Sequence, residues 1–429
     1  MRYFSTNRKS PHATFREVVE LGQPADKGVF FPTEIPKLSA EFLADLLTRS
    51  NAEIAFEIIR PYVGGNIPDV ELFEICAESI DFPFPLVQIT PKIFALELFH
   101  GPTLAFKDVG ARFMSQCLRF FSRNRTTRTL VIVATSGDTG GAVAAGFEGV
   151  DGVEVVILYP KGRISRFQEY QLTTPRVNVT TLEVRGSFDQ CQGMAKQALG
   201  DAELRRSAFI TSANSINVAR WLPQQFYYAF ALKNWDGKPP VVSVPRGNFG
   251  NIAAGLLVRA SGVPIKGFVA ACNANDTIPR FMATGSLEPQ PSVKTLSNAM
   301  DVGDPSNFAR VLEIFSHDLP GLKSSMIAIS VSDAKTAETM KSVYAEYDYV
   351  LDPHGAVGYR ALSDHLSNEP NSRGIFLETA HPAKFDSVTD IIGNYDVDPG
   401  VMAEAPDGTK SAQIDADYGQ LREILRSKI

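Results

Sequence analysis

The first candidate for chemistry in this 429-residue sequence is a lysine set among small and apolar residues. Lys107 ends the run His100-Gly-Pro-Thr-Leu-Ala-Phe-Lys and directly follows Ala105 and Phe106. Burial or a nearby positive charge lowers the pKa of a lysine, and the neutral amine is a nucleophile. Most lysines are solvated, so the spacing alone leaves an ordinary surface lysine as the alternative.

A glycine-bearing turn is the second candidate. Gly247-Asn-Phe-Gly-Asn251 follows the apolar run Val241–Val244 and precedes a helical pattern that starts at Ile252. Backbone N–H groups at the start of a helix bind anions, and glycines let the backbone approach a phosphate closely. The spacing differs from G-x-G-x-x-G, so a dinucleotide fingerprint is absent. A phosphate site and a simple capped turn both remain open.

Two further turns carry polar or basic side chains after apolar runs. Ser136, Asp138 and Thr139 follow the run Thr129–Ala134 and suit a carboxylate or phosphate, or simple helix capping. Lys161 and Arg163 follow Val153–Tyr159, where arginine offers a bidentate fork to an anion. Another polar cluster, Asn214 to Asn217, follows a later run. A solvated basic turn is the alternative for the Lys161 and Arg163 pair.

The elements that must position these turns are predicted from the apolar runs. Continuous Val/Ile/Leu runs suit strands that are buried on both faces, as in parallel sheets. Each run is followed by a glycine turn and a helical pattern, which predicts an α/β fold with doubly wound, mostly parallel sheets. In such sheets ligands bind at the carboxyl ends of the strands. Roughly the first 90 residues differ, because they are mostly helical in pattern with proline punctuation.

Composition excludes several classes. The 42 Lys and Arg against 48 Asp and Glu give a net charge of −6, so we expect no nucleic acid and no membrane as partner. The N-terminus lacks an apolar signal region, and the widely spaced cysteines indicate a reducing, cytoplasmic environment. No H-E-x-x-H pattern occurs, so no metal site is expected.

The candidate turns together resemble a known family. The segment 100–108 resembles the cofactor-lysine motif of threonine synthases, which are pyridoxal-phosphate enzymes of fold type II. Further segments resemble that family in the same order: 135–140, 212–217, 244–250, 297–302 and 379–385. The segment 28–32 also matches. The resemblance is to the bacterial and fungal branch, whose chains carry an extra N-terminal domain.

The resemblance implies a cofactor site. Lys107 would form a Schiff base with pyridoxal phosphate, and Thr379 would hydrogen-bond the pyridine nitrogen. The phosphate would lie in a cradle of five residues: Gly247, Asn248, Phe249, Gly250 and Asn251. It also implies a lyase that converts O-phospho-L-homoserine and water to L-threonine and phosphate, the last step of threonine biosynthesis.

The substrate contacts and domain limits are hypotheses that follow. We expect Ser136, Asp138 and Thr139 to hold the substrate carboxylate. We expect Lys161 and Arg163 to hold its phosphate, with Asn217 near it. The predicted domains are an N-terminal domain at 1–90 and a catalytic body at 91–429, with a smaller mobile subdomain at about 110–215.

Two alternatives remain. Another lyase of the same fold, such as a serine/threonine dehydratase, would share the lysine and the glycine loop. The Lys161 and Arg163 pair and the Gly-Pro-Thr lead-in argue against it. A non-catalytic protein with the same fold is less favoured, because Lys107 and the phosphate loop are intact.

Overall fold

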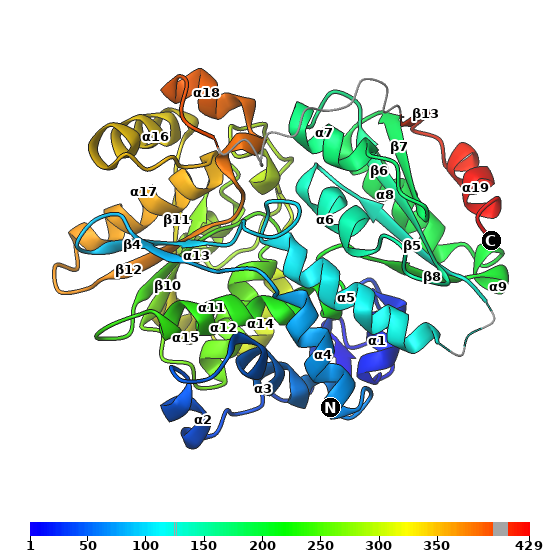
Figure 1. Ribbon diagram of the computed structural model, residues 1–429, viewed down its shortest axis with the longest axis horizontal. Coiled ribbons are helices and arrows are strands. Elements are labelled where there is room, and N and C mark those ends of the chain that lie inside the picture. The colour runs from blue at the N-terminus through cyan, green and yellow to red at the C-terminus, as the bar shows by residue number, and fades with distance from the viewer. Residues whose placement is uncertain (124, 126, 398–410) are drawn as a thin grey trace.

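A computed structural model describes residues 1–397, apart from 124 and 126, and residues 411–429. Two sheets lie side by side, each flanked by helices, and the N-terminal helices pack beneath them (Figure 1). We call the six-stranded sheet with its helices the larger lobe and the five-stranded sheet with its helices the smaller lobe. The predicted α/β class with mostly parallel sheets is confirmed.

The larger lobe contains a sheet of strand order β11-β10-β9-β12-β4-β3, parallel except for the antiparallel pair β3 and β4. Its strands are β3 (Leu86–Gln88), β4 (Ile93–Glu97), β9 (Val241–Pro245), β10 (Gly267–Cys272), β11 (Met326–Ser330) and β12 (Gly374–Glu378). Because β4, β12 and β9 are parallel neighbours, the loops after these three strands leave the same edge of the sheet.

The smaller lobe contains the parallel sheet β13-β7-β6-β5-β8. Its strands are β5 (Thr129–Ala134), β6 (Val153–Pro160), β7 (Val179–Arg185), β8 (Phe209–Ser212) and β13 (Ala412–Asp415). Every residue of β5 is buried, which matches its unbroken apolar run. The C-terminal strand β13 and helix α19 (Tyr418–Arg426) complete this lobe, an arrangement that the sequence analysis did not foresee.

Helices cover both sheets. The helices between residues 107 and 207 are α5 (Lys107–Ser122), α6 (Asp138–Gly146), α7 (Arg166–Thr173), α8 (Phe188–Gly200) and α9 (Leu204–Ser207). Later in the chain come α10 (Val218–Trp221), η1 (Leu222–Gln225), α11 (Phe226–Lys233), α12 (Gly250–Ala260), α13 (Thr277–Thr284), η2 (Asn298–Met300), α14 (Phe308–Ile314), α15 (Leu319–Ser325), α16 (Asp333–Tyr347), α17 (Pro353–Ser367), η3 (Pro382–Lys384) and α18 (Asp386–Ile392). Among the described residues, none of the helices is long and apolar enough to cross a membrane.

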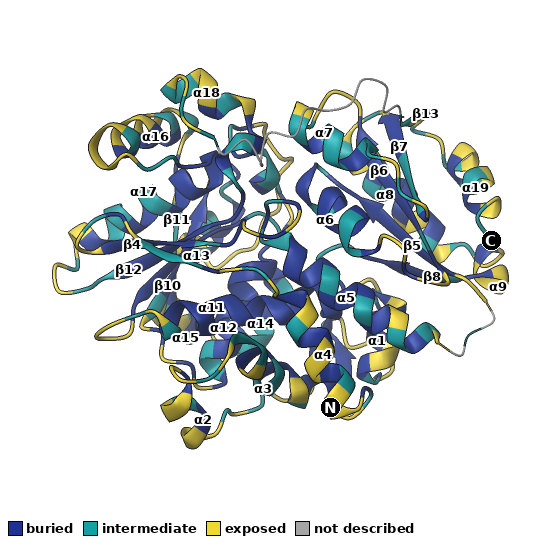
Figure 2. Ribbon diagram, in the orientation of Figure 1, coloured by how far each residue is buried: buried dark blue, intermediate teal, exposed yellow. Residues whose placement is uncertain are grey.

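The N-terminal segment is mostly helical, as its pattern predicts. It consists of β1 (Tyr3–Ser5), α1 (Phe15–Leu21), β2 (Phe30–Pro32), α2 (Ala40–Asp45), α3 (Asn51–Val63) and α4 (Asp69–Ser79). Capping boxes start α1 and α3, where Thr14 and Ser50 satisfy otherwise unpaired N–H groups. Its helices carry buried as well as exposed residues (Figure 2). Phe15 belongs to the same apolar cluster as Phe113 of α5, so this segment packs against the lobes.

Candidate active site

The loops after β4 and β12 meet at Lys107. The backbone N–H of Phe106 donates to the carbonyl of Thr379 at 2.9 Å, and Ala105 forms an antiparallel bridge with Ala380. Lys107 is the first residue of α5, and Thr379 directly follows β12. The structure therefore brings together the predicted cofactor lysine and the predicted partner of the pyridine nitrogen.

Lys107 lies at the junction of the two lobes. Its Nζ donates to Oδ2 of Asp138, the first residue of α6 in the smaller lobe, at 3.1 Å. Burial lowers the pKa of Lys107, and Lys384 and Arg220 lower it further, whereas Asp138 acts in the opposite direction. The pKa stays below the ordinary lysine value, which favours the neutral amine that a nucleophile or proton acceptor requires.

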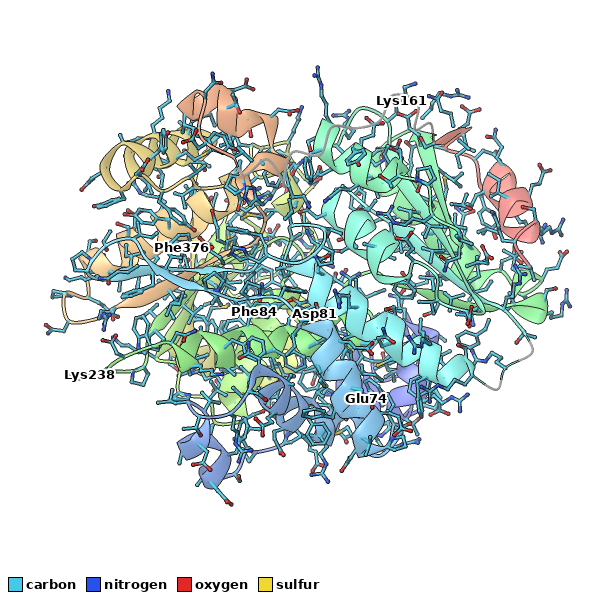
Figure 3. All side chains as sticks on the ribbon, viewed as in Figure 1. Glu74, Asp81, Phe84, Lys161, Lys238 and Phe376 are labelled. Atoms are coloured by element: carbon cyan, nitrogen blue, oxygen red, sulfur yellow. The ribbon has the colours of Figure 1, made fainter. Side chains whose placement is uncertain are left out.

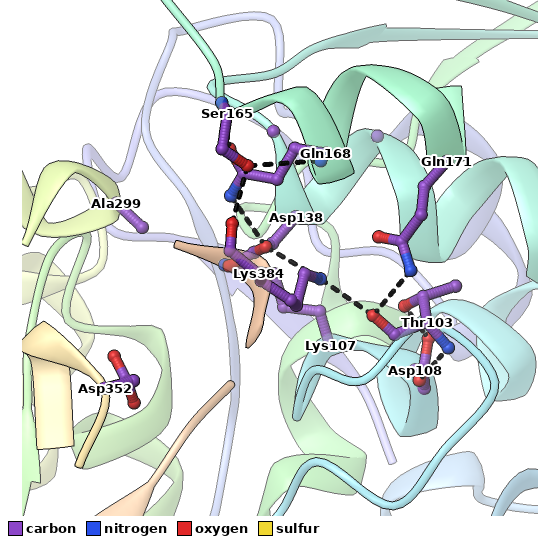
Figure 4. Close-up of polar contacts among 12 residues, drawn as sticks. Thr103, Lys107, Asp108, Asp138, Ser165, Gln168, Gln171, Ala299, Asp352 and Lys384 are labelled. Carbon is purple, nitrogen blue, oxygen red and sulfur yellow. Dashed lines mark hydrogen bonds and ion pairs between the residues drawn. The ribbon is translucent and has the colours of Figure 1, made fainter. Parts of the chain in front are cut away.

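A second lysine shares the same carboxylate. Nζ of Lys384, which is fully buried at the end of η3, lies 2.9 Å from Asp138 Oδ1 and donates to the carbonyl of Thr103 at 2.7 Å (Figure 4). Gln168 Nε2 donates to the same Oδ1 at 2.9 Å. Burial acts to raise the pKa of Asp138, but Lys107 and then Lys384 outweigh it and hold that pKa well below its usual range.

Sequence reasoning missed Lys384 and Gln168. Lys384 lies in the segment 379–385, which resembles the family, but its spacing gave it no role. The one available signal was its position a few residues beyond an apolar strand, at the edge where ligands bind. Its burial depends on Asp138 in the other lobe, and no local pattern reveals that contact.

The glycine turn after β9 forms a cradle at the same edge. Phe249 has φ +61°, an uncommon left-handed conformation for a bulky residue, and α12 starts at the next residue. A Cβ added to Gly247 would lie 2.6 Å from the carbonyl oxygen of Ala299, so only glycine fits there. Within the described chain, the backbone N–H groups of 247–251 have no hydrogen-bond acceptor.

Some polar side-chain atoms around this cradle also lack a hydrogen-bond partner among the described residues. Asn251 accepts from the Tyr228 hydroxyl at 2.7 Å, but among described residues its buried Nδ2 has no partner. Asn248 donates to Ser215 at 2.9 Å. Buried donors without acceptors are costly, so free N–H groups and a free amide at a helix start fit a bound phosphate. The residues present therefore suit the phosphate of the predicted cofactor.

The turn after β5 packs against α7. Gly137 has φ +130°, and a Cβ there would lie 2.4 Å from the side chain of Gln168. Ser136 and Thr139 are half-buried beside Asp138. Both oxygens of Asp138 are occupied by cations or an amide, so its immediate partners are Lys107, Lys384 and Gln168. Its predicted contact with a substrate carboxylate stays a prediction, as do those of Ser136 and Thr139.

Among the described residues, the remaining predicted contacts share no hydrogen bond or ion pair with Lys107, Asp138 or Lys384. Lys161 and Arg163 are exposed after β6, and Lys161 Nζ lies 3.8 Å from a carboxylate oxygen of Glu183 (Figure 3). Asn217 is fully buried, donates to the carbonyls of Val19 and Ser212, and caps α10. The structure thus gives Asn217 a structural role, and its predicted place near the substrate phosphate stays a prediction.

Comparison with known proteins identifies the class. Residues 83–375 match the family described as pyridoxal-phosphate dependent enzyme, and residues 2–80 match the threonine synthase N terminus. A curated threonine synthase from Haemophilus influenzae is 42% identical, with 99% of each chain covered. The structure of Escherichia coli threonine synthase is 40% identical, covers 100% of both chains and has a TM-score of 0.93. The pyridoxal-phosphate-bound structure from Brucella melitensis is 32% identical over 100% and 99%, with a TM-score of 0.91.

The family match over residues 83–375 and the similarity to a pyridoxal-phosphate-bound structure show that the chain is a pyridoxal-phosphate-dependent enzyme. Within that class, the chain belongs to the threonine synthase family. The predicted activity, lyase class and cofactor are thereby confirmed: this is a threonine synthase that uses pyridoxal phosphate.

Proposed function

We propose that the substrate is O-phospho-L-homoserine and that water replaces its phosphate, releasing L-threonine and inorganic phosphate. The observation that carries this proposal is a half-buried lysine, Lys107, paired with Asp138 at the strand edge that also holds an anion cradle at 247–251. The reaction needs sites for two phosphates and one carboxylate, and three separate turns at these strand ends suit anions.

The proposed cofactor site uses Lys107 for the covalent bond, the cradle at 247–251 for the phosphate and Thr379 for the ring nitrogen. Bound in this way, pyridoxal phosphate supplies an electron sink for the carbon next to the substrate amino group. A hydroxyl at Thr379 cannot give that nitrogen a full proton as a carboxylic acid would, so the electron sink is tempered. The amine of Lys107, once free, would take and return protons at the substrate carbons.

The proposed substrate contacts lie around this centre. Ser136, Asp138 and Thr139, at the start of α6, would line the site that holds the substrate carboxylate. Lys161 and Arg163 would bind the departing phosphate from the smaller lobe. Charge-assisted hydrogen bonds contribute roughly 1.5–3 kcal/mol each, so a few converging donors outweigh the repulsion of a net charge of −6.

The proposal extends to organisation and partners. Residues 1–90 would form the N-terminal domain and 91–429 the catalytic body, with about 110–215 moving as one subdomain to exclude water. The acidic net charge supports a chain without nucleic-acid partners. Four buried free cysteines support a reducing, cytoplasmic location.

The test is the product balance from purified protein. With O-phospho-L-homoserine, we expect phosphate and L-threonine in equal amounts, together with a visible cofactor absorption band. Lys107→Ala should lose product formation and the visible absorption band. Lys266→Ala, which removes a surface lysine paired with Glu369, should keep product formation and the band. Formation of 2-oxobutyrate from threonine as the main reaction would indicate a dehydratase. Cofactor binding without turnover would indicate a binding protein.

A further inference from the structure

Lys384 is a fully buried lysine that the proposed reaction does not use. It belongs to the larger lobe, while the carboxylate it contacts, Asp138, belongs to the smaller lobe. An unpaired ammonium ion in a protein interior is strongly unfavourable, so a buried lysine needs a paired and hydrogen-bonded setting. Asp138 at 2.9 Å and the Thr103 carbonyl at 2.7 Å supply that setting.

The two oxygens of Asp138 divide the cations between them. Oδ1 receives Lys384 and Gln168, and Oδ2 receives Lys107. The single negative charge of Asp138 therefore interacts with two ammonium groups, those of Lys107 and Lys384. The other charged group that acts on Lys107 is Arg220, which is also positive. Lys107 thus receives only part of a carboxylate and lies close to two like charges, a setting that opposes its protonation.

We propose that Lys384 is a positioning residue for Lys107: it holds Asp138 from the opposite lobe and so keeps that carboxylate from locking the Lys107 amine as an ammonium ion. The inference rests on the proposed role of Lys107 as the cofactor lysine. Bond formation needs the neutral amine, because its nitrogen must attack the cofactor aldehyde carbon. The nitrogen replaces the aldehyde oxygen, which leaves as water with the two amine protons.

The same contacts connect this effect to the approach of the lobes. The hydroxyl of Ser165, which caps α7, donates to the carbonyl of Lys384 at 2.6 Å (Figure 4). Gln171 of α7 donates to the Thr103 carbonyl at 3.1 Å, the same carbonyl that Lys384 uses. Lys384 meets Asp138 only when the lobes are together. Lys107 is held to the same loop after β12 by the Phe106–Thr379 hydrogen bond, so both ammonium groups contact Asp138 across the junction of the lobes.

The test measures how cofactor uptake depends on pH. Pyridoxal phosphate is added to the full-length chain freed of cofactor, and growth of the visible band is followed across about pH 6 to 10. Lys384→Met should raise the pH of half-maximal rate by about one unit. The carboxylate of Asp138 would then pair with the Lys107 amine only, which favours its protonated form. Lys384→Arg should restore the wild-type midpoint. Lys266→Met, at a surface ion pair, should leave it unchanged.

Asp138→Asn is the second variant, and it acts in the opposite direction. It removes the carboxylate that contacts Lys107 and keeps Asp108, the buried carboxyl that acts on Lys384 and Arg220, so the midpoint should fall below that of the wild type. A general disturbance of folding would not shift the two variants in opposite directions. Circular dichroism checks that each variant is folded, and if Lys384→Met is not, Lys384→Gln, which also removes the ammonium group, takes its place.

The outcomes separate this inference from the proposed function. A wild-type midpoint in folded Lys384→Met overturns the positioning role, as does a midpoint in Asp138→Asn at or above the wild-type value. A visible band in Lys107→Ala would instead overturn the cofactor lysine itself, and this inference with it. A normal band in wild type, its loss in Lys107→Ala and the opposite shifts support both.

Discussion

The backbone N–H of Phe106 donates to the backbone carbonyl of Thr379 at 2.9 Å, and this bond places Lys107 beside the end of β12. The bond uses only main-chain atoms on both sides. The hydroxyl of Thr379 takes no part in it, so a change of that hydroxyl leaves the register between the two loops intact. The position can therefore be tested without moving the lysine.

Thr379→Val should lower kcat about two- to tenfold, because a hydrogen bond contributes roughly 0.5–1.5 kcal/mol and the variant retains the side-chain shape. The visible absorption band should remain, since Lys107 and the phosphate cradle are unchanged. Steady-state kinetics with O-phospho-L-homoserine measures the effect, and Thr379→Ser serves as the control that keeps the hydroxyl. Wild-type kcat in Thr379→Val would argue against a role for this hydroxyl.

The larger elements could be predicted from the sequence because apolar runs mark them. The run Thr129–Ala134 has the same bounds as strand β5. Strand β6 begins with the run Val153–Tyr159 and extends one residue beyond it, to Pro160. These strands are buried on both faces, so their sequence alone carries the signal. The loops that follow them could be placed at the sheet edge for the same reason.

Other features depend on contacts between distant segments. Strand β13 (Ala412–Asp415) is short and mostly exposed, and it is a strand only because β7 lies beside it. The ion pair of Lys384 and the capping role of Asn217 could not be predicted for a similar reason. A buried lysine resembles a solvated one in sequence, and an asparagine that bonds the Val19 carbonyl resembles any polar loop residue.

Gly247→Ala should weaken cofactor binding. The added Cβ would lie 2.6 Å from the Ala299 carbonyl oxygen, and such overpacking typically costs about 1–3 kcal/mol. If the loop shifts to relieve the contact, the dissociation constant for pyridoxal phosphate should rise about tenfold, as titration of the visible band would measure. Gly193→Ala in α8 is the matched control, because a Cβ there meets no atom within 4 Å. Equal affinities in the two variants would contradict the cradle.

Asn217→Ala should destabilise the protein and leave substrate affinity nearly unchanged. It removes the cap of α10 and two hydrogen bonds, to the carbonyls of Val19 at 2.9 Å and Ser212 at 3.1 Å. The Val19 carbonyl keeps its bond from the Thr211 hydroxyl, and loss of the cap and of the two buried bonds should lower the free energy of unfolding by about 1–3 kcal/mol. Denaturant unfolding and KM are measured together. A raised KM with unchanged stability would support the predicted place of Asn217 near the substrate phosphate instead.

Arg163→Ala tests the proposed contact with the substrate phosphate. Loss of a charge-assisted hydrogen bond of roughly 1.5–3 kcal/mol should raise KM about tenfold or more. Arg206→Ala is the control, because Arg206 is an exposed arginine of α9 that precedes β8 and so lies at the opposite edge of the sheet. An unchanged KM in Arg163→Ala would remove this residue from the site.

The attachment of α19 should depend on pH through Asp201. Its carboxylate accepts from the Tyr418 hydroxyl and from Arg422, each at 2.7 Å, and these bonds, that of Tyr418 foremost, hold the pKa of Asp201 well below its usual range. A carboxyl whose pKa is lower in the folded state than in the unfolded state stabilises the folded state above the unfolded pKa, near pH 4. This contribution is lost as the pH falls through the folded-state pKa.

Hydrogen exchange of 418–426, corrected for intrinsic rates, should therefore accelerate upon acidification. Asp201→Asn should produce faster exchange already at neutral pH, and Asp276→Asn, which removes the partner of Arg280 in the larger lobe, should not. Equal protection of α19 in both variants would show that Asp201 is not needed, and that apolar contacts and the ion pairs of Arg422 and Arg426 with Glu203 hold the helix.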